Sequence, residues 1–83
     1  MTRQEIIEKT NAFLSGTLDI DKALITPDTE LKRDIGITSV DAVAIATFVQ
    51  KTFGIPIVMR DIKAIITLDD LYKYIEQNSP MAK

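Results

Sequence analysis

The residues best suited to do chemistry lie in one short segment, 34–41, which reads Asp-Ile-Gly-Ile-Thr-Ser-Val-Asp. It joins Gly36 to two hydroxyl side chains, Thr38 and Ser39, directly before a strongly helical pattern. A helix start suits a phosphate, because free backbone N–H groups point outward there and the helix dipole favours an anion. Ser and Thr are also the commonest helix N-caps, so spacing alone favours a cap over a phosphate site.

The composition excludes several kinds of reactive site. The chain has 83 residues and contains neither Cys nor His, which removes disulfides, thiolate metal sites and the Ser–His–Asp triad. A formal net charge of −2 gives no electrostatic basis for binding nucleic acid. The longest apolar run, 42–46, is too short for a membrane span. With no recognisable export leader, we expect a cytoplasmic binding, carrier or regulatory module.

Hydrophobic periodicity predicts an all-α bundle with a long ordered first loop and a short third helix. The predicted helices cover residues 3–15, 39–53, 59–65 and 68–77. Gly16 is the expected left-handed residue after the first helix. Residues 17–38 show no clean period, but their scattered aliphatic residues indicate an ordered connection. We expect a single domain over 1–83, with an ordered core of about 3–77 and a tail over 78–83.

The helix over 39–53 is apolar on more than one side. Its main stripe, Ile45, Val49 and Phe53, is typical of a core-facing side. The apolar residues off that stripe are Val40, Val43, Ala44 and Phe48. Such a helix either lies centrally in the core or has a second apolar face for a partner. The pattern leaves both open, and for Phe48 we favour the partner contact over a second core position.

Two acidic pairs, Asp19 with Asp21 and Asp69 with Asp70, are the remaining candidates for metal ligands. Neither pair has a third ligand at a recognisable spacing. Acids also suit the first turn of a helix, where Asp69 and Asp70 fall. We therefore expect solvated surface and no metal site.

The segment Gly36-Ile37-Thr38-Ser39-Val40 resembles the attachment motif of the acyl carrier protein family, which includes the peptidyl carriers. That motif reads roughly Gly-x-Asp-Ser-Leu at the start of the family's second helix. The resemblance covers roughly residues 3–77. Outside the motif, the residues that also resemble the family pattern are Leu31, 34–36, 53–55, Ile57, 66–68 and 71–75.

The resemblance implies a 4′-phosphopantetheine arm joined to Ser39 through a phosphodiester, with Thr38 and Gly36 completing the cofactor-binding segment. A phosphopantetheinyl transferase would take the arm from coenzyme A. The thiol of the arm would hold an acyl or aminoacyl group as a thioester, which loading and synthase enzymes attach and process. The missing Cys and His fit this division of labour, because the cofactor supplies the sulfur and the partners supply acid–base groups. The chain itself would be a monomeric carrier and not an enzyme.

The chain also departs from the family pattern. Thr38 stands where the family commonly has Asp, and the helix over 39–53 has one acid and one base. Fatty-acid-synthesis carriers are usually rich in Glu on this helix, so a dedicated polyketide, peptide or lipid pathway is favoured. The expected partner-binding residues are Val40, Asp41, Val43, Ala44, Thr47, Phe48 and Lys51. The alternative is an interaction or regulatory module with the same fold that is never modified.

Overall fold

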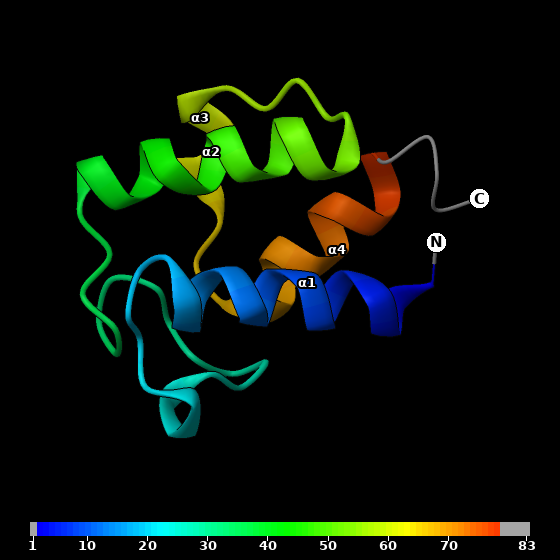
Figure 1. Ribbon diagram of the computed structural model, residues 1–83. Coiled ribbons are helices and arrows are strands. Elements are labelled where there is room, and N and C mark those ends of the chain that lie inside the picture. The colour runs from blue at the N-terminus through cyan, green and yellow to red at the C-terminus, as the bar shows by residue number, and fades with distance from the viewer. Residues whose placement is uncertain (1, 79–83) are drawn as a thin grey trace.

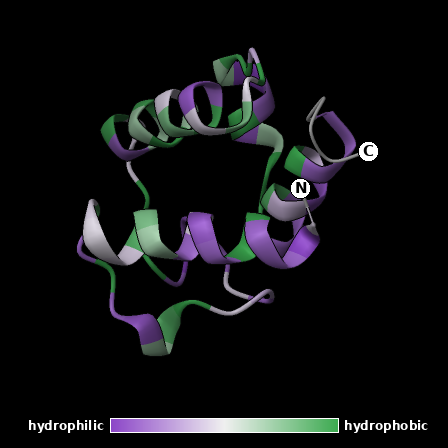
Figure 2. Cartoon of the chain, turned by 45° about the vertical axis from the view of Figure 1, so that its right-hand side comes forward, coloured by the Kyte–Doolittle hydropathy of each residue, from purple (hydrophilic) through white to green (hydrophobic). Residues whose placement is uncertain are grey.

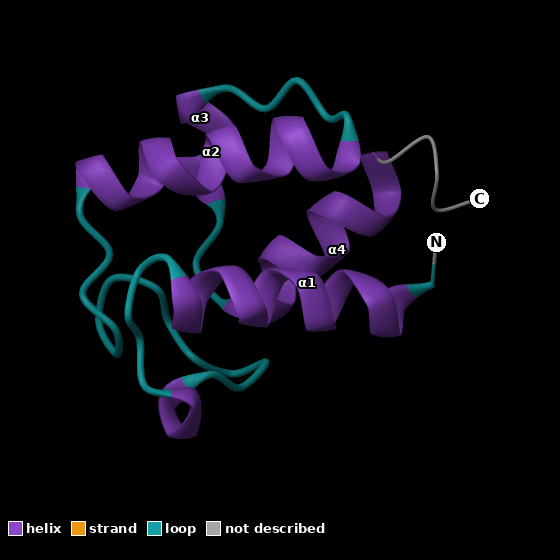
Figure 3. Ribbon diagram, viewed as in Figure 1, coloured by secondary structure: helices purple, strands orange, loops and turns teal. Residues whose placement is uncertain are grey.

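Four α-helices joined by ordered loops make up the computed structural model, which describes residues 2–78. The helices are α1 (Arg3–Gly16), α2 (Ser39–Phe53), α3 (Met59–Ala64) and α4 (Leu68–Asn78), with a 3₁₀ turn η1 (Lys22–Leu24) in the first connection. Figure 3 shows helices and loops only over this part of the chain. The predicted all-α architecture, with a long first loop and a short third helix, is confirmed.

The two longest helices lie one above the other in Figure 1, with α4 placed between their levels. The helix α4 contacts α1, and the short α3 contacts α2. An aromatic pair also links the last turns of α1 to the middle of α2, because Phe13 stacks on Phe48. The start of α2, which carries the candidate site, therefore lies at one end of a packed bundle.

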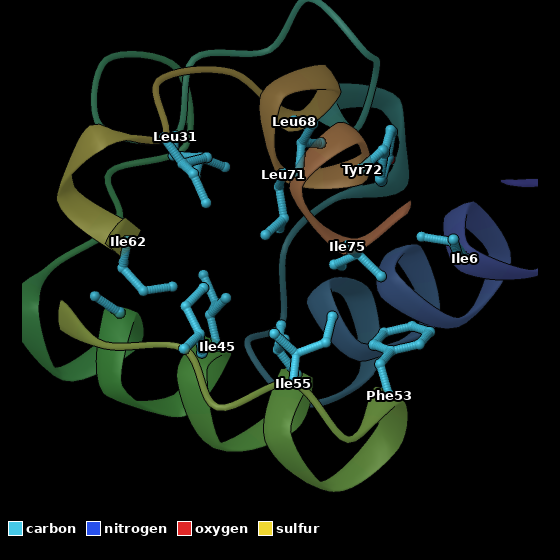
Figure 4. Close-up of a cluster of buried hydrophobic side chains, with 14 of the residues drawn as sticks. Ile6, Leu31, Ile45, Phe53, Ile55, Ile62, Leu68, Leu71, Tyr72 and Ile75 are labelled. Atoms are coloured by element: carbon cyan, nitrogen blue, oxygen red, sulfur yellow. The ribbon is translucent and has the colours of Figure 1, made fainter. Parts of the chain in front are cut away.

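The core is built from one side of each helix. Figure 4 shows these side chains pointing from the surrounding helices toward a common centre. The buried members on the helices include Ile6, Leu14, Ile45, Val49, Phe53, Ile62, Leu68, Leu71, Tyr72 and Ile75. The predicted stripe of α2, Ile45, Val49 and Phe53, is thus confirmed. Hydrophilic residues colour much of the rest of α1 and α4 in Figure 2, as expected for helices with one exposed side.

The long connection between α1 and α2 is ordered because it packs and forms hydrogen bonds. Leu31 is buried, and its N–H donates to the carbonyl of Ile66 over 2.9 Å. The Thr29 carbonyl accepts from the N–H of Leu68 over 3.0 Å, and Glu30 forms an isolated antiparallel bridge with Thr67. These bonds attach the connection to the segment before α4 and so set where α2 begins.

Three helix ends differ slightly from the expected bounds. Gly16 lies inside α1, whose C-cap is Thr17 in a right-handed conformation, so the expected left-handed Gly16 is wrong. The left-handed residue is Asp19, with φ 57°, in the turn where the Ile20 N–H donates to the carbonyl of Leu14; Asp tolerates this conformation better than most residues. The helix α3 ends at residue 64 and α4 at 78, each one residue from its expected end, and 79–83 of the expected tail lie outside the described residues.

Candidate functional site

The first turn of α2 is closed by Thr38, which is the helix N-cap. Its Oγ1 accepts a hydrogen bond from the Asp41 N–H over 3.3 Å, and the Asp41 Oδ2 accepts from the Thr38 N–H over 3.2 Å. This reciprocal pair is a complete capping box. Ser39 is the first residue inside the helix and not its cap, and Ala42, three places after it, has no side-chain acceptor for a second capping box.

Ser39 is left with a free side chain as the first residue of α2. It is exposed, and its hydroxyl makes no hydrogen bond to any residue that the structure describes. The backbone N–H groups of Ser39 and Val40 are likewise unbonded within residues 2–78, as expected for the first positions of a helix. A hydroxyl, two free N–H donors and the positive end of a helix dipole therefore meet at one exposed point.

This arrangement suits a phosphate ester on the Ser39 oxygen. The two N–H groups can donate to phosphate oxygens, and the helix dipole favours the negative charge. The chain has no Cys or His to act as a base at the hydroxyl. The site can therefore present and stabilise a phosphodiester, and neither a thiol nor an imidazole of this chain is available to activate the hydroxyl.

The turn before the site depends on Gly36, whose φ of 62° is left-handed. A Cβ added there would meet nothing within 4 Å, so the requirement concerns backbone conformation and not space. The turn is held by the Ile37 N–H, which donates to the carbonyl of Leu31 over 2.9 Å. Gly36 thus turns the chain into α2, so that Thr38 becomes the N-cap and Ser39 the first residue of the helix.

The carboxylate of Asp34 holds the same turn. It accepts a hydrogen bond from the Glu30 N–H over 2.8 Å and lies 3.5 Å from the Arg33 Nε. The bond from Glu30 and the charge of Arg33 lower the pKa of Asp34 below its ordinary value of 3.8. Asp34 is therefore ionised at neutral pH, and its carboxylate interacts with Glu30 and Arg33 of the same loop.

An apolar cavity of about 240 Å³ begins beside Ser39. Its apolar walls come from the first loop, α2, α3 and α4, and they include Leu31, Ile37, Ala42, Ile45, Ile62 and Leu71. Thr38 and Ser39 line it at the start of α2, and Lys32 and Lys63 line it as the two basic residues. A group attached to Ser39 therefore has an apolar space next to it.

Sequence reasoning did not find this cavity or its two lysines. Lys32 and Lys63 are 31 positions apart and belong to no motif. Each follows a buried residue, Leu31 and Ile62 respectively, and this is the only local hint that they lie at the edge of the core. They line one cavity because the Leu31 N–H of the first loop bonds to the carbonyl of Ile66, just after α3.

The expected partner-binding residues lie along α2 from the site. Val40 is 79% exposed and Val43 52% exposed, which is unusual for residues of this type. Thr47 and Lys51 are exposed as well, whereas Asp41 and Ala44 are half-buried. Whether these residues contact a partner stays a prediction.

Phe48 differs from the rest of that group. It is half-buried, its ring stacks on Phe13 with centroids 4.4 Å apart, and it meets Phe53 edge-on at 5.6 Å. Phe48 therefore packs against Phe13 and Phe53, and whether its exposed part also contacts a partner stays a prediction. This packing depends on Phe13, which lies on another helix, so the pattern of α2 alone could not reveal it.

Residues 2–78 contain neither a cluster of metal ligands nor a membrane-spanning helix. No group of three or more Asp, Glu, His or Cys residues is arranged to hold a metal ion in this range. Within the same residues, none of the helices has the length and apolar character needed to cross a membrane.

Comparisons with known proteins agree with the site. The family model described as "Phosphopantetheine attachment site" matches residues 12–75. An acyl carrier protein of Onion yellows phytoplasma is 36% identical over 75 residues, which are 90% of this chain and 99% of that protein. The acyl carrier protein of Thermotoga maritima is 30% identical over 76 residues, 92% of this chain and 94% of that protein. The chain therefore belongs to the acyl carrier protein family, whose members are carriers with covalently bound 4′-phosphopantetheine and not enzymes.

Proposed function

We propose that Ser39 is the attachment site of the 4′-phosphopantetheine arm, and that the chain carries acyl or aminoacyl intermediates for a dedicated biosynthetic pathway. A phosphopantetheinyl transferase installs the arm from coenzyme A, and loading and synthase enzymes then act on its thiol. The chain presents the arm and docks to these enzymes. We further propose that the carrier is monomeric, forms one domain and works in the cytoplasm, as expected from the sequence.

The observation that carries the attachment site is the free hydroxyl of Ser39. Thr38 already caps α2, because its Oγ1 accepts from the Asp41 N–H. The Ser39 hydroxyl is therefore not needed for capping, and attachment there would break no capping bond. During transfer the Ser39 Oγ forms a bond to phosphorus of coenzyme A, adenosine bisphosphate leaves, and a base of the transferase takes the hydroxyl proton. The chain contributes the N–H groups of Ser39 and Val40, which face the new phosphodiester.

The exposed face of α2 supports a dedicated pathway. This helix has one acid, Asp41, and one base, Lys51, and Asp41 is engaged in the capping box. Val40 and Val43 are the large hydrophobic residues that this helix exposes. A partner that recognises an acidic helix by charge would find little to bind here. A partner with a complementary apolar surface would find a suitable face.

Intact mass after incubation with coenzyme A and a promiscuous phosphopantetheinyl transferase tests the attachment site. The wild-type chain should gain the mass of one phosphopantetheine group, and Ser39→Ala should gain none. Ser15→Ala is the matched control and should be modified like the wild type. Modification that persists in Ser39→Ala would overturn the assignment. An unmodified wild type, beside a carrier that is modified in the same reaction, would favour the alternative of a helical interaction module.

The pathway is tested by loading the modified chain with a malonyl transferase of general fatty-acid synthesis. We expect its kcat/KM to be at least tenfold below that for an acidic carrier. The triple variant Ala44→Glu, Gln50→Glu and Lys51→Glu should recover much of this loss, because it restores acids to α2. Two acids placed elsewhere, by Lys9→Glu and Lys22→Glu, should recover little. Efficient loading of the unaltered chain would overturn the dedicated pathway.

A further inference from the structure

Two lysines from separate elements converge on the opening beside Ser39. Lys32 comes from the first loop and Lys63 from α3, and both line the cavity that Thr38 and Ser39 also line. The same two lysines line a neighbouring hollow of about 170 Å³. They therefore border both spaces, one of which begins beside Ser39.

Neither lysine has an acidic partner within 4.0 Å among residues 2–78, and both are exposed. The acid of the site, Asp41, accepts from the Thr38 N–H. Unpaired lysines also occur elsewhere on this surface, so the lack of a partner does not distinguish Lys32 and Lys63. Their shared position beside a helix start does, because two ammonium groups and the positive end of α2 line one cavity. The nearby carboxylates have other partners, since Asp41 belongs to the capping box and Glu30 pairs with Arg33.

We propose that Lys32 and Lys63 bind the phosphodiester that joins the arm to Ser39. This inference rests on the proposed function, in which Ser39 carries that phosphodiester. A phosphodiester has one negative charge at all physiological pH values, and an ammonium group binds phosphate as a point charge. The two lysines approach from the side of the cavity, while the free N–H groups of Ser39 and Val40 approach from the helix. The arm then starts from a fixed phosphate at the opening of the apolar cavity.

In the unmodified protein Lys32, Lys63 and the start of α2 line one cavity, and under this proposal the repulsion among their positive charges lowers stability slightly. Attachment of the arm brings the compensating negative charge. Loading should therefore raise the thermal midpoint, and added salt should reduce the increase, because the groups are exposed and screened.

The experiment compares unmodified and fully loaded protein, with loading established first by intact mass. The readouts are the ³¹P chemical shift of the phosphodiester and the difference in thermal midpoint between loaded and unmodified chain. The variants are Lys32→Gln, Lys63→Gln and their combination. Lys9→Gln and Lys22→Gln are the matched controls, since they remove exposed lysines that do not line the cavity.

We expect each cavity variant to move the ³¹P shift, and the double variant to lose at least half of the increase in thermal midpoint. The controls should change neither quantity. A double variant that keeps the wild-type ³¹P shift and the wild-type increase would overturn the proposal. An effect that appears only when the thiol carries an acyl group with a free carboxylate would also overturn it, because the lysines would then bind the cargo.

Failure of this proposal is distinct from failure of the attachment site. If Ser39 is not modified, the wild-type mass remains unchanged and no ³¹P signal appears. If Ser39 is modified but the lysines do not bind the phosphodiester, the mass increases and the ³¹P signal appears. The lysine variants then behave like the controls. A variant that the transferase does not load is replaced by a synthetic chain that carries the phosphopantetheine group on Ser39, with the same readouts and expectations.

Discussion

Phe13 of α1 and Phe48 of α2 stack with their ring centroids 4.4 Å apart and their planes 17° apart. Phe48 also meets the buried Phe53 edge-on, so three aromatic rings from two helices form one cluster. The stack joins the end of α1 to the middle of α2. It thereby helps to fix the spacing between α1 and α2, the helix whose first residue is Ser39.

The aromatic cluster predicts an order of stability losses. Phe53→Ala removes a fully buried ring and should lower the free energy of unfolding by about 3 to 5 kcal/mol. Phe48→Ala should lower it by less, because that ring is only half-buried. A double-mutant cycle between Phe13 and Phe48 in urea should give a coupling of about 0.5 to 1.5 kcal/mol. A coupling near zero would show that the stack does not hold the two helices together.

The capping box predicts different roles for two adjacent hydroxyls. Thr38→Ala removes the acceptor of the Asp41 N–H and should lower the free energy of unfolding by about 1 kcal/mol. Ser39→Ala removes an exposed, unbonded hydroxyl and should leave stability nearly unchanged, while it abolishes attachment. Thr38→Ser keeps the acceptor and is the control, with stability near the wild type. Equal losses from Thr38→Ala and Ser39→Ala in chemical denaturation would contradict this division.

Much of the fold could be predicted because burial follows helical periodicity. The stripe of Ile45, Val49 and Phe53 follows from spacing alone, and so does the side of α4 that includes Leu68 and Ile75. Caps are equally local. Thr67 accepts from the Asp70 N–H at the start of α4, and the Asp70 side chain accepts in return. Residues three apart in sequence decide such features.

The features that sequence reasoning missed all depend on distant parts of the chain. For Phe48 the sequence left the core position open as an alternative, and the ring that it packs against, Phe13, lies on another helix. Lys32 and Lys63 share a cavity because the first loop bonds at Leu31 to Ile66, just after α3. The left-handed residue after α1 is Asp19 and not Gly16, because the chain turns only where Ile20 can bond back to Leu14.

Thr10 predicts a stabilising substitution in the core. It is 1% exposed, and its Oγ1 has no hydrogen-bond partner within the described residues. Thr10→Val keeps the shape and removes the unpaired hydroxyl, and Val and Thr have similar helix propensities. The free energy of unfolding should rise by about 1 kcal/mol.

Thr47→Val is the matched control for Thr10→Val. Thr47 is exposed, and its Oγ1 donates to the Val43 carbonyl over 3.0 Å, so this change should give no comparable gain. Urea denaturation of both variants against the wild type checks the comparison. A loss of stability in Thr10→Val would mean that its hydroxyl has a partner that the protein needs.

Asp34 predicts a dependence of stability on acid pH. The Glu30 N–H and Arg33 lower the pKa of Asp34 in the folded protein below 3.8, so folding favours the ionised form. The resulting stability is fully present above the unfolded pKa and is lost as the pH falls through the folded pKa. The difference in unfolding free energy between wild type and Asp34→Asn should therefore be largest near neutral pH and shrink below pH 3.8. A carboxyl titration by NMR with a midpoint above this value would contradict the assignment.

The exposed apolar face of α2 predicts how affinity for a partner responds to salt. Burial of Val40 and Val43 in an interface acts through desolvation and shape, which salt screens little. The dissociation constant for a cognate loading enzyme should therefore change only modestly between low and physiological salt. Val43→Ser should weaken binding more than Asp41→Asn or Lys51→Gln, because charges at the rim mainly affect the association rate. If instead affinity falls steeply with salt and Val43→Ser is nearly neutral, the charges of the loop and of α3 guide docking, and the apolar face of α2 does not.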